Sequence, residues 1–93
     1  MEKNRDELER AAAIQQEKKN IRRLQLVVDL TTSALYQDSN MSLEEARRMV
    51  RGAERAVLNL FPDKQSTFDI VLLPRFERIL YERWGEGLDG TVH

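Results

Sequence analysis

Carboxylates and arginines are the side chains that could do chemistry in this chain, because it has no cysteine and its one histidine is the last residue, His93. Asp29 is the strongest acid–base candidate, since it lies between Val28 and Leu30 and precedes a run of hydroxyl side chains. A carboxyl group that is partly buried in such surroundings has a raised pKa and often marks a site. An enzyme or ligand carrier built on Asp29 needs a pocket between the first and third predicted helices. Neighbouring helical residues point about 100° apart, however, so we favour a place for Asp29 on the polar edge of its helix.

The other patterns argue against catalytic, metal-binding and cofactor-binding sites. Glu44 and Glu45 are adjacent, so they point in different directions, and carboxylates at a helix start favour the helix dipole. A diiron bundle needs Glu-x-x-His pairs on facing helices, and there is no internal histidine. No glycine-rich loop joins a strand to a helix as a phosphate site requires. We therefore predict that the protein is not an enzyme and holds no metal or cofactor, with His93 a solvated residue of the tail.

The arginines form the one pattern suited to a charged ligand. Arg48, Arg51 and Arg55 share one face of a predicted helix, and the guanidinium fork matches phosphate geometry. Glu44 and Glu54 are interleaved with them, which is typical of a salt-bridged surface. The whole chain has 15 basic and 16 acidic residues, and a near-neutral protein neutralises phosphates poorly. Nucleic-acid binding through these arginines is the alternative function, and nucleic acid is not the partner we expect.

Length and composition indicate one small globular domain. The chain has 93 residues, of which 41% are hydrophobic and 33% charged, with a mean hydropathy of -0.59. That is the composition of a soluble, folding protein. No apolar run approaches the roughly 20 residues that span a membrane, and the charged first residues do not form a signal peptide. We expect a cytoplasmic protein that makes no membrane contact.

Residues 2–37 are predicted to form one long helix, or two helices with an unmarked break, and a further helix is predicted before residue 62. Residues 2–37 contain no proline or glycine and consist mostly of strong helix formers. A turn follows, and then Ser42 is placed as an N-cap with Glu45 completing a capping box. This second helix runs to about Phe61, before a proline. Gly52 lies in its middle at a cost of about 1 kcal/mol relative to alanine, which predicts the close approach of a neighbouring helix.

A third helix is predicted to end near Trp84. Its N-cap is either Asp63 or Ser66, the latter paired with Asp69. Pro74 removes one backbone hydrogen bond, but the apolar periodicity continues through it, so we expect a kink rather than an end. The core positions expected on this helix are Phe68, Leu72, Phe76, Ile79 and Leu80. Glycines from residue 85 onward are expected to end the helix and open a flexible tail.

The helix lengths determine the expected architecture. A first helix of about 35 residues would be about 52 Å long, whereas the other two would be about 30 Å. Residues 2–20 are nearly all polar, whereas apolar residues recur at helical spacing from Ile21 to Leu35. We therefore predict an all-α fold: a three-helix antiparallel bundle over residues 21–84, with a charged helical arm at 1–20, a kinked third helix and a flexible tail at 85–93. A seven-residue spacing links Ile14, Ile21, Val28 and Leu35.

A bundle of about 65 residues has a small core and gains stability by association. Two surfaces are candidates for this contact. The arm could pair with another arm through Leu8, Ala11 and Ile14, or the end of the third helix could contribute Tyr81 and Trp84. A place in the core is an equal alternative for Trp84. Twofold dimers are the commonest oligomers. The leading hypothesis is a noncatalytic protein-interaction module, a homodimer that also has surface for docking another protein.

Overall fold

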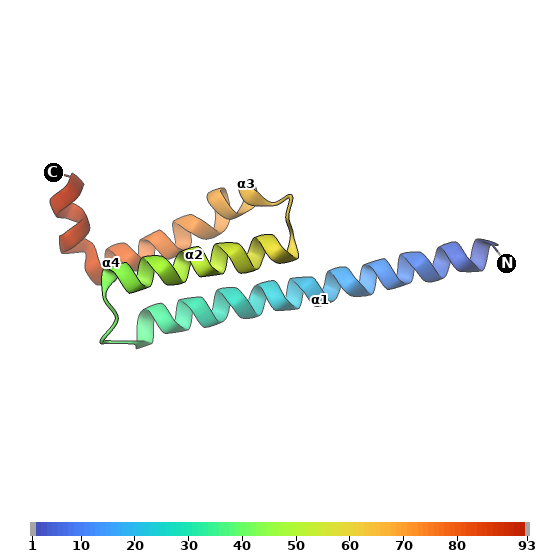
Figure 1. The fold of residues 1–93 in the computed structure, drawn as a ribbon, viewed down its shortest axis with the longest axis horizontal. Coiled ribbons are helices and arrows are strands. Elements are labelled where there is room, and N and C mark those ends of the chain that lie inside the picture. Colours follow the sequence, from blue (N-terminus) through green and yellow to red (C-terminus); the bar gives the residue numbers. More distant parts are fainter. Residues whose placement is uncertain (1, 93) are drawn as a thin grey trace.

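The computed structural model describes the backbone of residues 2–92 and the side chains of residues 4–85. Its elements are α1 (Glu2–Gln37), α2 (Leu43–Leu60), α3 (Gln65–Thr67), the π-helical turn η1 (Phe68–Leu72) and α4 (Leu73–Val92). No strand occurs in residues 2–92, so the predicted all-α class is confirmed. Figure 1 shows α3, η1 and α4 following one another as a third helical rod, with α2 antiparallel to α1 and to this rod.

The predicted long first helix is confirmed and makes the molecule extended. α1 is one uninterrupted helix of 36 residues, about 54 Å at 1.5 Å per residue. Its N-terminal half projects beyond the end of α2 in Figure 1, and the molecule measures 65 × 25 × 15 Å. Every side chain in residues 4–19 is exposed, and burial starts only at Asn20. We call residues 4–20 the arm.

The second helix begins at the predicted N-cap, Ser42, although Glu45 bonds to the Ser42 hydroxyl and not to its backbone N–H as a full capping box requires. The Ser42 hydroxyl accepts a hydrogen bond from the Glu45 backbone N–H at 3.1 Å and donates one to the Glu45 carboxylate at 3.1 Å. This satisfies one of the free donors at the helix start. The residues that α2 buries recur at intervals of three and four, which gives one apolar face. They are Ala46, Val50, Ala53 and Val57.

The start of the third rod differs from both predictions. The helix begins at Gln65, and neither Asp63 nor Ser66 acts as its N-cap. The side chain of Gln65 holds this turn instead, since its amide donates to Glu54 on α2 at 2.7 Å and to Asp69 at 3.0 Å. The carboxylate of Asp69 is thereby engaged with the first turn through Gln65 rather than with Ser66. Gln65 thereby links the start of the third rod to α2.

The interruption predicted at Pro74 takes the form of a π-helical turn. In η1 the Leu73 N–H bonds to the Phe68 carbonyl, five residues earlier. Pro74 has no N–H to offer Ile70, and its ring would clash with that carbonyl in a regular α-helix. The wider turn just before the proline accommodates the ring, and the helix continues beyond it as expected.

A second break falls at the end of the bundle. Trp84 has non-helical backbone angles, φ -126° and ψ 26°. The straight part of α4 ends there, one residue before Gly85, but helical backbone then continues to Val92 in a new direction (Figure 1). The helix therefore continues beyond Trp84, where the glycines that follow led us to expect its end. The flexibility of residues 85–93 stays a prediction, and His93 lies outside the described residues.

The core lies where α1, α2 and the third rod meet. The rings of Phe68 and Phe76 pack at 6.4 Å with a 44° tilt and are almost completely buried. Phe68 is the first residue of the π-helical turn and Phe76 lies beyond it, so the bulge keeps two aromatic rings on the same side of the rod. Four of the five core positions predicted on the third helix are fully buried, and Leu72 is partly buried against them. The buried hydrophobic residues are Leu35, Met41, Ala46, Val50, Ala53, Val57, Phe68, Phe76, Ile79 and Leu80.

The close helix approach predicted at Gly52 is wrong. A Cβ built there would meet one neighbour within 4 Å, the Arg55 guanidinium at 3.9 Å. We therefore expect Gly52→Ala to stabilise the protein by about 0.5–1 kcal/mol, through higher helix propensity and lower entropy of the unfolded chain. Thermal unfolding followed by circular dichroism should show Tm rising by a few degrees. Ala56→Gly, at a half-buried site of the same helix, should lower it. A lower Tm for Gly52→Ala would contradict this.

Candidate functional site

The arm presents large apolar side chains to solvent. Leu8 is 70% exposed and Ile14 is 53% exposed, and Ala11 between them is exposed as well. Side chains three residues apart differ by about 60° in direction around the helix axis. These three residues therefore form a band that runs obliquely across the helix surface. Ile14 belongs also to a straighter stripe with Ile21, 42% exposed, and the half-buried Val28. That stripe leads from the arm into the bundle.

A second apolar patch on α1 was missed in the sequence. Leu26 and Leu30 are 56% and 61% exposed, one helical turn apart. Their side chains point away from the core, because the positions that pack on the core, Leu24, Val28 and Leu35, lie on the other side of the helix. The sequence contains the signal for this patch. Helical spacing alone places these two leucines outside the apolar stripe that faces the core, on a face that is otherwise polar.

The two aromatic candidates on α4 have different surroundings. Trp84 is half-buried and packs against the core, with the Arg83 guanidinium 4.4 Å from its ring centroid. Tyr81 is 53% exposed at the surface. The structure therefore places Trp84 at the edge of the core and Tyr81 outside it. A role for either side chain in an interface stays a prediction.

Arg83 caps the C-terminal end of α1, a role that the sequence did not reveal. Its guanidinium donates to the Leu35 carbonyl and, at 2.9 Å, to the Asp38 carbonyl. The last carbonyls of a helix lack partners and carry the negative end of the dipole, so a cation there is stabilising. The last turn of α1 contains no basic residue. The cap comes instead from α4, 48 residues further along the chain.

A second polar contact fixes the same end of the bundle. The Tyr36 hydroxyl on α1 donates to the Glu82 carboxylate on α4 at 3.1 Å. This hydrogen bond raises the pKa of Tyr36 above its usual value of 10.0, because the carboxylate favours the neutral phenol. Together with the cap made by Arg83, it holds α1 and α4 in a fixed relation.

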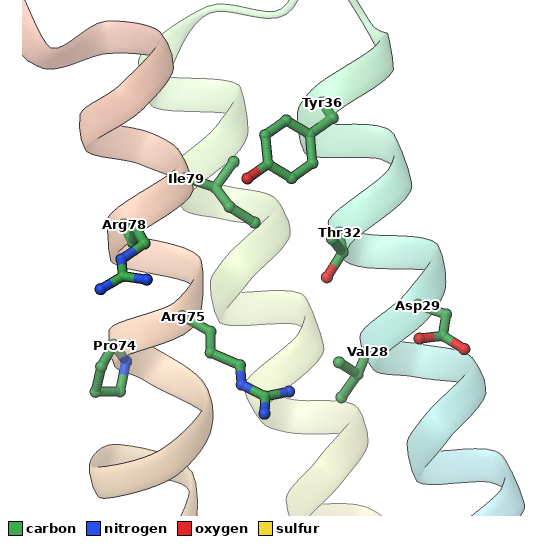
Figure 2. Close-up of a pocket in the computed structure, with 8 residues that line it drawn as sticks. All are labelled: Val28, Asp29, Thr32, Tyr36, Pro74, Arg75, Arg78 and Ile79. Carbon is green, nitrogen blue, oxygen red and sulfur yellow. The ribbon is translucent and has the colours of Figure 1, made fainter.

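A groove of about 500 Å³ separates α1 from α4 below this contact. It is the pocket that the hypothesis of a site near Asp29 requires. Asp29 itself is exposed, however, which agrees with the favoured place on the polar edge of the helix. The groove is lined by Val28, Asp29, Thr32 and Tyr36 from α1 and by Pro74, Arg75, Arg78 and Ile79 from α4 (Figure 2).

The groove combines an apolar floor with positive charge. Val28, Pro74 and Ile79 supply the apolar surface. Figure 2 shows Val28 projecting from α1 toward α4, and Arg75 extending from α4 toward α1. Arg75 and Arg78 are exposed, and among the side chains of residues 4–85 neither forms an ion pair. This arrangement suits an occupant that brings both an apolar side chain and a carboxylate.

The predicted arginine face lies on the solvent side of α2. Arg48, Arg51 and Arg55 are all exposed, and Arg47 beside them is exposed too. Arg48 is partnered by Glu44 at 3.4 Å, an exposed pair between successive helical turns. Such pairs contribute little to stability. The other arginines of this face leave an excess of positive charge on one side of α2.

The described residues contain neither a candidate metal site nor a helix suited to a membrane. Their His, Cys, Asp and Glu side chains nowhere gather in groups of three or more that could hold a metal ion. Within the described part of the chain, no helix combines the length and apolarity needed to cross a bilayer. Comparison of the chain with models of protein families, with curated proteins and with solved structures finds no match.

Proposed function

We propose that this protein is a noncatalytic interaction module that self-associates as a homodimer through its arm. The observation that carries the proposal is the exposure of Leu8 and Ile14, 70% and 53%, on a helix that leaves the bundle. Most helices in proteins are stabilised by packing an apolar face against other elements. The arm has no such packing within the chain, so a partner helix would supply it.

The chemistry of the described side chains supports the noncatalytic part of this proposal. The groove brings together one exposed carboxylate, two arginines and two hydroxyl groups, with no histidine or cysteine to activate them. Its one perturbed group is the Tyr36 hydroxyl, which is held in its neutral form by Glu82. A side chain held neutral by a structural hydrogen bond is a poor general base.

The test uses two variants of the full chain. Leu8→Ser combined with Ile14→Ser should shift the molar mass from that of a dimer to that of a single chain, because the apolar surface of the arm is lost. The matched control is Leu26→Ser with Leu30→Ser, which removes two exposed leucines from the part of the same helix outside the arm and should leave the mass unchanged. Light scattering on a sizing column measures both. An arm variant that keeps the mass of the intact protein would contradict the proposal.

A second candidate function is polyanion binding by α2. It is favoured by the exposed arginines Arg47, Arg51 and Arg55, for which the described side chains provide no ion pair. Binding of this kind is strongest at low salt and falls steeply as salt is added. A mobility-shift titration with duplex DNA and with RNA at about 50 mM salt tests it. Absence of a shift with both probes would remove this candidate.

A further inference from the structure

The apolar stripe of α1 is symmetric about Ile21. Ile14 precedes Ile21 by seven residues and Val28 follows it by seven. In a twofold dimer, if residue i contacts residue j of the second copy, then j contacts i. An antiparallel pair of α1 helices with Ile21 on the twofold axis therefore places Ile14 of each copy against Val28 of the other. All three members of the stripe are paired in this antiparallel register.

The groove continues this stripe within the bundle. Val28 is both the last member of the symmetric set and a lining residue of the groove, beside Pro74 and Ile79 of α4. An arm that follows the stripe in the antiparallel direction enters the groove at Val28 and extends toward Tyr36. Residues 6–14 of the arm would then lie along residues 28–36 of the second copy. The small side chains of residues 11–13, all alanine, suit a close approach between two helices.

One charge pair is matched in this register, between Glu7 of the arm and Arg78 of the groove. Glu7 lies on the same stripe, seven residues before Ile14. It therefore falls level with Leu35 of the second copy, near the end of the groove where Arg78 is a lining residue. Arg78 lacks an ion pair among the side chains of residues 4–85. A carboxylate reaching it from a second copy would supply one.

We propose that the arm of each copy docks antiparallel in the groove between α1 and α4 of the other copy, with Ile21 on the twofold axis. This inference rests on the proposed self-association and adds its binding site, orientation and register. The occupant of the groove is therefore a second copy of this chain. Each copy gives an arm and receives one, so the contact closes at two chains.

Single cysteines test the register directly, because the chain has none of its own. A disulfide requires Cα atoms within about 7 Å. Under oxidised glutathione, Ile21→Cys should form a disulfide-linked dimer, because the two sulfurs meet at the axis. Ile14→Cys alone should not cross-link, whereas an equal mixture of Ile14→Cys and Val28→Cys should. Leu30→Cys, on the opposite side of α1, measures background cross-linking.

The outcomes separate this inference from the function on which it rests. Cross-linking of both Ile14→Cys and Ile21→Cys as single variants would mean parallel arms and overturn the register. A dimeric mass without a cross-link above background at Ile21 would overturn the docking mode and leave self-association intact. If the intact protein has the mass of a single chain, both the docking mode and the proposed self-association are wrong.

A charge exchange gives an independent readout of the groove. Arg78→Glu and Glu7→Arg should each weaken the dimer by about tenfold, since an exposed ion pair is replaced by repulsion at two symmetric sites. The two substitutions in one chain should restore most of the affinity. Arg51→Glu on α2 is the matched control and should leave it unchanged. Equal effects of Arg78→Glu and Arg51→Glu, or no restoration in the double variant, would overturn the contact.

Discussion

Phe76→Ala should cost about 3–5 kcal/mol of the free energy of unfolding, the usual loss for truncating a buried aromatic ring. Phe76 is 1% exposed and packs against Phe68 at the point where all three helical layers meet. A chain of this size has about 5–14 kcal/mol of stability in total, so the variant should be largely unfolded at modest denaturant. The single tryptophan, Trp84, packs on the same core and reports the transition by fluorescence.

The control for this prediction is Ile70→Ala. Ile70 lies in the same π-helical turn as Phe68 but is 74% exposed. Its truncation should change stability by less than about 0.5 kcal/mol, as surface substitutions do. Urea unfolding of both variants, followed by circular dichroism and fluorescence, measures the difference. Similar losses for Phe76→Ala and Ile70→Ala would contradict the placement of the core around the bulge.

Arg83→Met should have the next largest effect, about 1.5–3 kcal/mol, the usual range for a hydrogen bond to a charged group. Methionine keeps much of the length of the side chain but cannot donate to the carbonyls of Leu35 and Asp38. The loss leaves those carbonyls without the arginine and removes the cation that favours the dipole of α1. It should also loosen the end of the groove, because Arg83 helps to hold α1 beside α4.

Arg51→Met serves as the comparison, since Arg51 is an exposed arginine within α2 without an ion pair in the described side chains. It should leave the midpoint of urea unfolding almost unchanged. Hydrogen exchange adds a local readout: in Arg83→Met the amides of the last turn of α1 should exchange faster than in the unmodified protein. If Arg51→Met and Arg83→Met destabilise equally, the capping role of Arg83 is wrong.

The features predicted correctly from the sequence depend on local information. The start of α2 follows from Ser42 and Glu45, which are three residues apart and satisfy each other. The core face of the third helix follows from a spacing that continues across Pro74. The projection of α1 follows from its length and from the polarity of its first half. Each of these signals lies within a few helical turns of the residues that it describes.

The features that sequence reasoning missed depend on contacts between distant segments. The third helix starts at Gln65 and not at a predicted cap, and the Gln65 side chain bonds to Glu54 on another helix. Gly52 is not in close contact with a neighbouring helix, and only the spacing between packed helices reveals this. The capping role of Arg83 is not visible in the sequence, because its carbonyl partners lie 48 and 45 residues away.

The groove illustrates both cases. Asp29 drew attention to the space between the first and third helices, and the structure places a groove there. The positive charge of the groove comes from Arg75 and Arg78 on α4. Their position opposite Val28 depends on the packing of the bundle. Periodicity in α1 alone indicates the stripe of Ile14, Ile21 and Val28, whereas the receiving surface needs the tertiary structure.

The molar mass of the intact protein in solution is the most direct test of the account. Light scattering on a sizing column, at two concentrations and two salt levels, should give twice the 10.9 kDa of one chain. This mass should be the same at both salt levels, because apolar contacts along the arm carry the association, and it should hold at concentrations above the dissociation constant. A mass of one chain under all four conditions would contradict self-association and the docking of the arm together.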